Sequence, residues 1–199
     1  SRRRHTRYPL VTGVQTCALP ISKYTGKVQH IQWDAISYQG MRLAHKNVLG
    51  KEVIPAMDFS KAKTIVSVGA DFLGTWMSSN LFQGDYASTR RPEGEWMSKH
   101  YQFEATMSLT GSNADVRIPI KPSQEGAVVA ALYNAIKGGS ADVAGVDSSR
   151  IARIAEELKA NAGESIVVAG SNNVDVQSIV CAINNELKNY GSTRSEEHT

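Results

Sequence analysis

Two short turns that follow apolar runs contain the residues best suited to hold a ligand. Gly69, Ala70 and Asp71 follow the run TIVSV, and Gly170 and Ser171 follow the run SIVVA. The carboxyl end of a buried parallel strand offers backbone N–H groups, which bind phosphates and similar anions. Neither turn has GxGxxG or P-loop spacing, so a tight turn that requires glycine explains each as well as a ligand site does.

A third candidate lies at the start of a predicted helix. The segment KPSQE, residues 121–125, places Ser123 where its hydroxyl and nearby N–H groups could contact an anion. The alternative for Ser123 is an ordinary N-cap of its own helix.

The other reactive side chains favour structural roles. His30, His45 and His100 lack HxxH or HExxH spacing, which argues against a metal site. Cys181 lies on the apolar face of a predicted helix, where a small buried hydrophobic residue is expected rather than a nucleophile. The chain has no CxxC or ferredoxin-type run of cysteines for an iron–sulfur cluster.

Strands that alternate with helices predict an α/β fold with a mostly parallel, Rossmann-like sheet and helices on both faces. Aromatic residues between 72 and 86 are expected in the core. The predicted strands are 27–33, 64–68, 116–120 and 165–169, with an ambiguous strand within 96–107 and Pro119 indicating a sheet edge or a strand end. Predicted helices begin near Asp34, Leu73, Ser123, Ser148 and Asp175.

Both ends of the chain are predicted to be foreign to the protein. Codons for Val11–Ile21 resemble a short-read sequencing adapter, Ser1–Arg7 resembles its upstream part, and Arg194–Thr199 resembles the opposite adapter. We therefore assign 1–21 and 194–199 to adapter-derived tails, with a natural basic arm as the alternative. Residues 22–193 are then expected to be a fragment of a longer α/β protein.

Excluding these tails removes the basic character of the chain. The tails hold five of the 22 lysines and arginines and two of the 19 acidic residues, so 17 of each remain. A chain with no net charge gives no electrostatic reason to expect nucleic-acid binding. The remaining residues contain no apolar run near the roughly 20 residues of a membrane span, so no direct span is expected.

Three stretches resemble a known family. They are GADFLGTW at 69–76, the segment from MSKHYQFEATMSLTGSNADV to ALYNAI at 97–136, and INNELKNYGST at 183–193. Together they resemble the large iron–sulfur subunit of bacterial alternative complex III, a Tat-translocated, molybdopterin-oxidoreductase-like protein. The resemblance extends over essentially all of 23–193 and implies a part of a molybdopterin-oxidoreductase-like domain.

The resemblance also implies what the three turns are. In catalytic relatives, the turns that match 69–71 and 121–125 lie near the nucleotide part of the molybdopterin cofactor. Here Ser123, Gln124 and Glu125 replace a common Gly-Thr-Asp, and Asp71 replaces a common Asn. Loss of a glycine restricts backbone approach, and acidic residues repel diphosphates. Residues 69, 70, 71, 123, 170 and 171 are therefore predicted to be vestigial cofactor-binding positions.

Alternative complex III is a respiratory quinol oxidoreductase on the periplasmic face of the bacterial inner membrane. The resemblance implies that this chain is a scaffold within it, without a cofactor of its own. The resemblance implies partners that include haem-bearing and integral membrane subunits, and iron–sulfur clusters in a C-terminal ferredoxin-like domain outside this chain. One alternative is the cofactor-binding part of a catalytic molybdopterin-guanine-dinucleotide oxidoreductase. Another is a small nucleotide-binding module, complete in itself.

Overall fold

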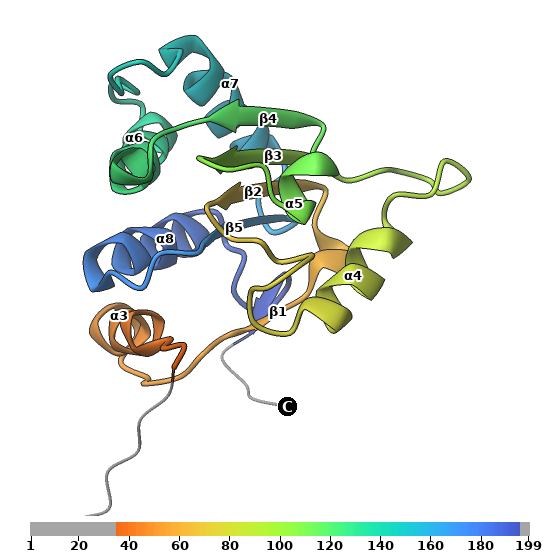
Figure 1. Ribbon diagram of the computed structural model, residues 1–199, viewed down its shortest axis with the longest axis horizontal. Coiled ribbons are helices and arrows are strands. Elements are labelled where there is room, and N and C mark those ends of the chain that lie inside the picture. The colour runs from red at the N-terminus through yellow and green to blue at the C-terminus, as the bar shows by residue number, and fades with distance from the viewer. Residues whose placement is uncertain (1–34, 196–199) are drawn as a thin grey trace, which may run out of the picture. The chain divides into compact units, whose positions relative to one another are not determined.

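A four-stranded parallel sheet is the framework of the computed structural model, which describes residues 35–195 (Figure 1). The strand order is β4-β3-β2-β5, and all neighbouring pairs are parallel. Every residue of β2 and β5 is buried, as expected for a parallel sheet covered on both faces. The strands are β2 Thr64–Val68, β3 Lys99–Glu104, β4 Val116–Pro119 and β5 Ser165–Ala169.

Helices cover both faces of this sheet. Side chains of α6, α7 and α8 form one core against the sheet, whereas α4 and the loop before it contribute to the other. Among the described residues, none of the helices is long and apolar enough to cross a membrane. The helices are α3 Gln39–Leu49, α4 Ser79–Ser88, α5 Leu109–Ser112, α6 Glu125–Ile136, α7 Ser148–Ala160 and α8 Val174–Glu186, with 3-10 turns η1 Phe59–Lys61 and η2 Pro122–Gln124.

Alternation along β2 divides the apolar side chains between the two cores. Val66 and Val68 pack with α6, α7 and α8, and Ile65 packs on the opposite side. On that side Phe59 stacks on Phe72 with ring centroids 4.4 Å apart. Complete burial of each such side chain stabilises the fold by about 1.5–3 kcal/mol. The predicted α/β class, with a parallel sheet between helices, is confirmed.

Several predicted boundaries were wrong for local reasons. The first described helix begins at Gln39 rather than near Asp34. The helix predicted from Leu73 begins at Ser79, because the Asp71 carbonyl accepts bonds from the N–H groups of residues 74–76 and closes a turn first. The ambiguous segment within 96–107 is β3, and β4 with Pro119 does lie at the sheet edge. The strand predicted at 27–33 lies outside the described residues.

The predicted caps were also partly wrong. Ser123 does not cap α6; it lies within η2, where Gln124 Oε1 accepts a bond from the Lys121 N–H at 2.8 Å. Asp147 caps α7, rather than the predicted Ser148 or Ser149, because its carboxylate accepts the Ser149 N–H. Asn173 caps α8 by accepting bonds from residues 175 and 176. Each cap lies one or two residues from the predicted start.

A two-stranded ribbon joins distant parts of the chain. β1, Ala56–Met57, pairs antiparallel with β6, Arg194–Ser195. Arg194 is only 1% exposed, and its Nε and Nη1 atoms have no hydrogen-bond partner within the described residues. Burying these donors costs free energy, which the contact of the guanidinium with the Tyr190 ring offsets in part. The assignment of 194–199 to a foreign tail stays a prediction.

The outer edge of β5 is satisfied by side chains. Asn184, which is fully buried, accepts a bond from the Val167 N–H at 3.1 Å and donates to the Val167 carbonyl at 2.8 Å. Thr193 donates to the Ser165 carbonyl, and Gln177 donates to the Ala169 carbonyl. An open edge can pair with another strand, so these side chains end the sheet at β5.

We predict that Asn184→Ala lowers the free energy of unfolding by about 2–3 kcal/mol, because the N–H and C=O of Val167 lose buried partners. Denaturant unfolding followed by circular dichroism measures the change. Asn185→Ala is the matched control, since Asn185 is the exposed neighbour, and a change within about 0.5 kcal/mol is expected. Equal effects of the two substitutions would contradict the edge-capping role.

Candidate functional site

The three turns singled out from the sequence meet at the carboxyl edge of the sheet. A Cβ atom added to Gly170 would lie 2.2 Å from the Gly69 carbonyl oxygen, so the first two turns are in direct contact. A Cβ on Gly69 would lie 2.6 Å from Oε1 of Glu125, at the start of α6. Gly69 also has φ of +64°, a conformation that favours glycine. Gly69 and Gly170 are thus brought together, with the Glu125 carboxylate against Gly69.

The N–H groups of Gly69 and Gly170 already donate hydrogen bonds to neighbouring strands of the sheet. The Gly69 N–H donates to the Phe103 carbonyl at 2.7 Å, and the Gly170 N–H donates to the Val68 carbonyl at 2.9 Å. Ala70 follows Gly69 and is fully buried. These two N–H groups therefore extend the ladder and do not point toward a ligand.

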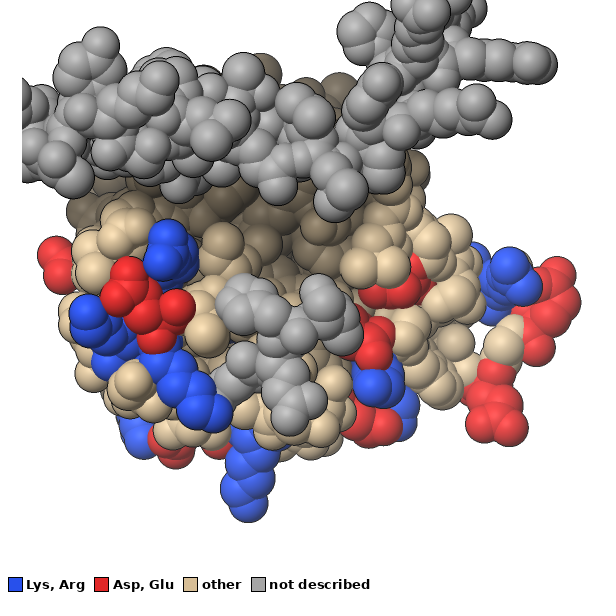
Figure 2. All heavy atoms as spheres, turned by 90° about the horizontal axis from the view of Figure 1, so that it is seen from below, with Lys and Arg blue, Asp and Glu red and all other residues tan. Residues whose placement is uncertain are grey.

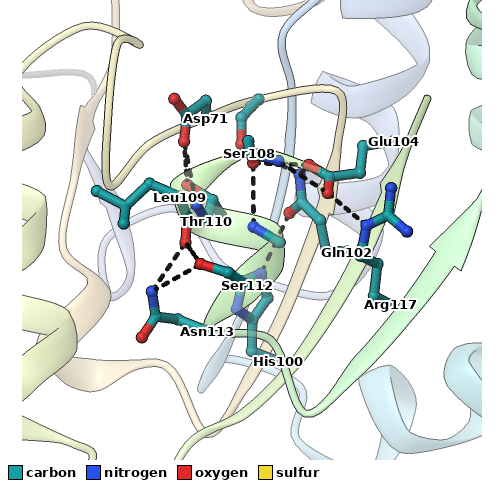
Figure 3. Close-up of polar contacts among 12 residues, drawn as sticks. Asp71, His100, Gln102, Glu104, Ser108, Leu109, Thr110, Ser112, Asn113 and Arg117 are labelled. Atoms are coloured by element: carbon teal, nitrogen blue, oxygen red, sulfur yellow. Dashed lines mark hydrogen bonds and ion pairs between the residues drawn. The ribbon is translucent and has the colours of Figure 1, made fainter. Parts of the chain in front are cut away.

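Asp71 is bound by threonines of this chain. Its carboxylate accepts bonds from the Thr110 N–H at 3.1 Å and hydroxyl at 2.8 Å, and from the Thr75 N–H at 3.1 Å and hydroxyl at 3.2 Å. Burial tends to raise the pKa of Asp71, but these hydrogen bonds outweigh it, and the pKa lies below its ordinary value. The ionised carboxylate holds α5 against the turn after β2 (Figure 3).

Glu104, at the end of β3, holds the same short helix from its other side. Its carboxylate accepts bonds from the Ser108 hydroxyl at 2.6 Å and N–H at 3.2 Å, and from Arg117 Nε at 2.6 Å (Figure 3). Ser108 in turn caps α5 by accepting the Gly111 N–H. Burial opposes ionisation, yet the hydrogen bonds from Ser108 and Arg117 keep the pKa of Glu104 below its ordinary value.

Sequence reasoning missed a polar stripe along the buried β3. His100, Gln102 and Glu104 alternate on one face and are each at most 4% exposed. Gln102 Nε2 lies 3.2 Å from Glu104 Oε2, and Gln102 Oε1 lies 3.3 Å from His100 Nε2. Since an ionised carboxylate only accepts, the Gln102 amide donates to Glu104, and His100 donates from Nε2. The signal available in the sequence was the H-x-Q-x-E alternation.

The other end of this stripe is closed by Tyr86. His100 Nδ1 lies 3.3 Å from the Tyr86 hydroxyl, which donates to the Asn113 carbonyl at 2.9 Å. Burial lowers the pKa of His100 to about 4, so the ring is neutral at physiological pH. Burial also raises the pKa of Tyr86 to about 12. The stripe therefore consists of two neutral side chains, His100 and Gln102, that lead to the Glu104–Arg117 ion pair.

The turn after β5 is covered by α3. The Gly40 N–H donates to Asn172 Oδ1 at 2.8 Å, and a Cβ on Gly40 would lie 2.0 Å from the Asn172 carbonyl oxygen. Ser171 is held locally, because its hydroxyl accepts the Asn173 N–H and its carbonyl accepts from Gln177. This close approach explains the glycine within α3.

These residues fit an anionic nucleotide group poorly. Three carboxylates, from Asp71, Glu104 and Glu125, line the edge, and Arg117 already pairs with Glu104. Glu125 is half-buried, and this burial raises the pKa of its carboxyl group. Ser123 is exposed within η2. A diphosphate at this edge would meet carboxylates and two occupied glycine amides rather than a nest of free donors.

The other candidate side chains lie elsewhere. Cys181 is fully buried, and burial raises the pKa of its thiol, as expected for a structural cysteine. His45, also fully buried, lies next to it, with its Nδ1 atom 2.8 Å from the Met41 carbonyl oxygen. Within residues 35–195, no three His, Cys, Asp or Glu side chains form a group that could hold a metal ion. His30 lies outside the described residues.

Comparison with known proteins gives a fold likeness only. No protein-family model and no curated protein matches the chain. Among solved structures, the chain is similar to the formyltransferase/hydrolase complex from Methylorubrum extorquens in complex with methylofuran, with a TM-score of 0.50 and 14% identity. The similarity covers 78% of this chain, which spans only 42% of the matched chain. At this identity it supports the α/β fold and says nothing of activity.

We predict that Thr110→Val lowers the free energy of unfolding by about 1–3 kcal/mol, because Asp71 and the Leu73 N–H lose a buried partner. Thr75→Val is the matched control, since Thr75 is exposed and loses only its hydroxyl bond; a change within about 0.5 kcal/mol is expected. Denaturant unfolding measures both. A Thr110 effect as small as that of Thr75 would show that α5 is held by other contacts.

Glu104 should make stability depend on pH in a defined direction. Its pKa is lowered on folding, so its contribution is complete above the unfolded value near 4.5 and is lost as pH falls through the folded value. We predict that Glu104→Gln destabilises by about 2 kcal/mol near pH 7 and by less near pH 4. Unfolding at both pH values tests this, with exposed Glu164→Gln as control. A pH-independent difference would be incompatible with this linkage.

Proposed function

We propose that this chain is a scaffold portion of the large iron–sulfur subunit of a bacterial alternative complex III, without a cofactor of its own. The observation on which this rests is that its inherited ligand turns are filled by the chain itself. Glu125 lies against Gly69, Asp71 binds Thr110, and Gly40 covers Asn172. The sequence motifs suggest the family. The contacts that fill the turns support the loss of the molybdopterin cofactor from this chain.

A scaffold must hold its shape under contact with partners. The polar stripe on β3, the carboxylate contacts to α5 and the capped β5 edge all restrict movement of the sheet. In this proposal the partners are haem-bearing and integral membrane subunits on the periplasmic side. Iron–sulfur clusters would belong to a C-terminal ferredoxin-like domain of the same large subunit.

Surface charge supports a protein partner over nucleic acid. On the face drawn in Figure 2, lysine and arginine side chains are interspersed with acidic ones, among many uncharged residues. The ion pairs Arg42–Glu52, Lys46–Glu52 and Lys63–Glu164 also place opposite charges next to one another. The visible part of this face shows no single-sign stripe of the kind that phosphate backbones require.

Metal and cofactor analysis of the full-length subunit, purified within its complex, tests the proposal. We predict iron from clusters and haem, but neither molybdenum nor extractable pterin at stoichiometric amounts, because the three turns present carboxylates in place of free donors. A molybdenum-containing oxidoreductase measured in parallel is the positive control. Stoichiometric molybdenum or pterin would overturn the scaffold proposal in favour of a catalytic molybdopterin-guanine-dinucleotide oxidoreductase.

A further inference from the structure

We propose that the groove along β4 binds an extended acidic segment of a partner protein, with apolar side chains between its carboxylates. This rests on the scaffold function proposed above and assigns the surface through which one partner is held. β4 is the outer strand of the sheet, and α7 lies beside it (Figure 1). In contrast to β5, whose edge is covered by α8 side chains, β4 borders two hollows.

The first hollow lies between α7 and the beginning of β4, with a volume of about 280 Å³. Its floor is apolar, from Val116, Ile118 and Ile154, and the Tyr101 ring lies beside them. Its rim is cationic, from Lys99, Arg150 and Arg153. The hollow therefore accepts an apolar side chain that is flanked by a negative charge.

The second hollow lies at the carboxyl end of β4 and beside the residues that follow it, with a volume of about 540 Å³. Pro119 and Ile120 line it together with Ala144 of the loop between α6 and α7. Lys121 supplies a cation there. The two hollows thus border successive residues of one segment: 116 and 118 of β4 for the first, and Pro119 with the following residues 120 and 121 for the second. An extended segment of about four to six residues spans that length at roughly 3.3 Å per residue.

The charges of the groove are only partly neutralised. Lys99 pairs with Glu157 at 2.7 Å, and Arg150 lies 3.6 Å from the exposed Asp147. Arg153 and Lys121 form no ion pair within the described part of the chain. Two cations at opposite ends of an apolar groove are complementary to an apolar segment with carboxylates on both sides.

Backbone pairing alone cannot account for recognition here. Pro119 has no N–H group, so an added strand would lack a donor at that position. Selectivity must come from side chains that enter the two hollows and from the rim charges. This requirement distinguishes the groove from a generally adhesive sheet edge, and it predicts dependence on both charge and side-chain order.

The test uses the full chain and a fluorescein-labelled heptapeptide, Asp-Val-Glu-Leu-Glu-Val-Asp, in fluorescence anisotropy. We predict saturable binding that weakens with salt, and weaker binding of a peptide of the same composition with its acidic residues grouped at one end. Arg153→Glu should weaken binding of the alternating peptide by about tenfold, through loss of attraction and gain of repulsion. Arg91→Glu, an identical charge change at an exposed loop residue, is the matched control and should leave binding unchanged.

Three outcomes would overturn this inference: no binding by the unmodified chain, equal binding of both peptides, or equal effects of the two arginine substitutions. None of them would bear on the scaffold proposal, which the metal and pterin analysis decides separately. Conversely, molybdenum in the subunit together with the predicted peptide behaviour would remove the cofactor-free scaffold while leaving the groove as a binding surface.

Discussion

Two carboxylates hold the shortest connection of the sheet, and the arrangement of the carboxyl edge depends on them. Only residues 105–115 join β3 to the parallel β4, which is near the minimum length for such a crossover. This segment has room for the single turn α5, which is too short to bury an extensive apolar face. Asp71, from the turn after β2, compensates by binding Thr110, and Glu104, at the end of β3, compensates by binding the N-cap Ser108. Charge-assisted hydrogen bonds thus take the place of helix packing.

This constraint also determines what the edge can bind. Parallel α/β sheets commonly place ligands where strands end and N–H groups remain free. Here Asp71 is committed to Thr110, Glu104 to Ser108 and Arg117, and the Gly69 and Gly170 amides to the ladder. The residue types that suggest a ligand-binding turn in the sequence therefore make hydrogen bonds within the fold instead.

The two edges of the sheet have different physical properties, which bear on how partners are held. At β5, Asn184 satisfies both backbone groups of Val167, and Thr193 and Gln177 donate to the Ser165 and Ala169 carbonyls. At β4, an apolar floor and a partly unpaired cationic rim remain beside the strand. A scaffold whose β5 edge is capped by side chains, and whose β4 edge is free to bind a segment, favours a single orientation of its partner.

The class of fold and the position of its turns follow from the order of the amino acids. The runs TIVSV and SIVVA had to be buried strands, and Gly69 and Gly170 had to end them, because these properties depend on local composition and backbone freedom. Helix starts were misplaced by a few residues, since Asp71 and Gln124 close local turns before the helices begin, and Asn173 caps α8 two residues before the predicted start. Which groups meet at the turns is a property of the folded chain. Glu125 faces Gly69, and Gly40 meets Asn172, across separations in the chain that no local pattern encodes.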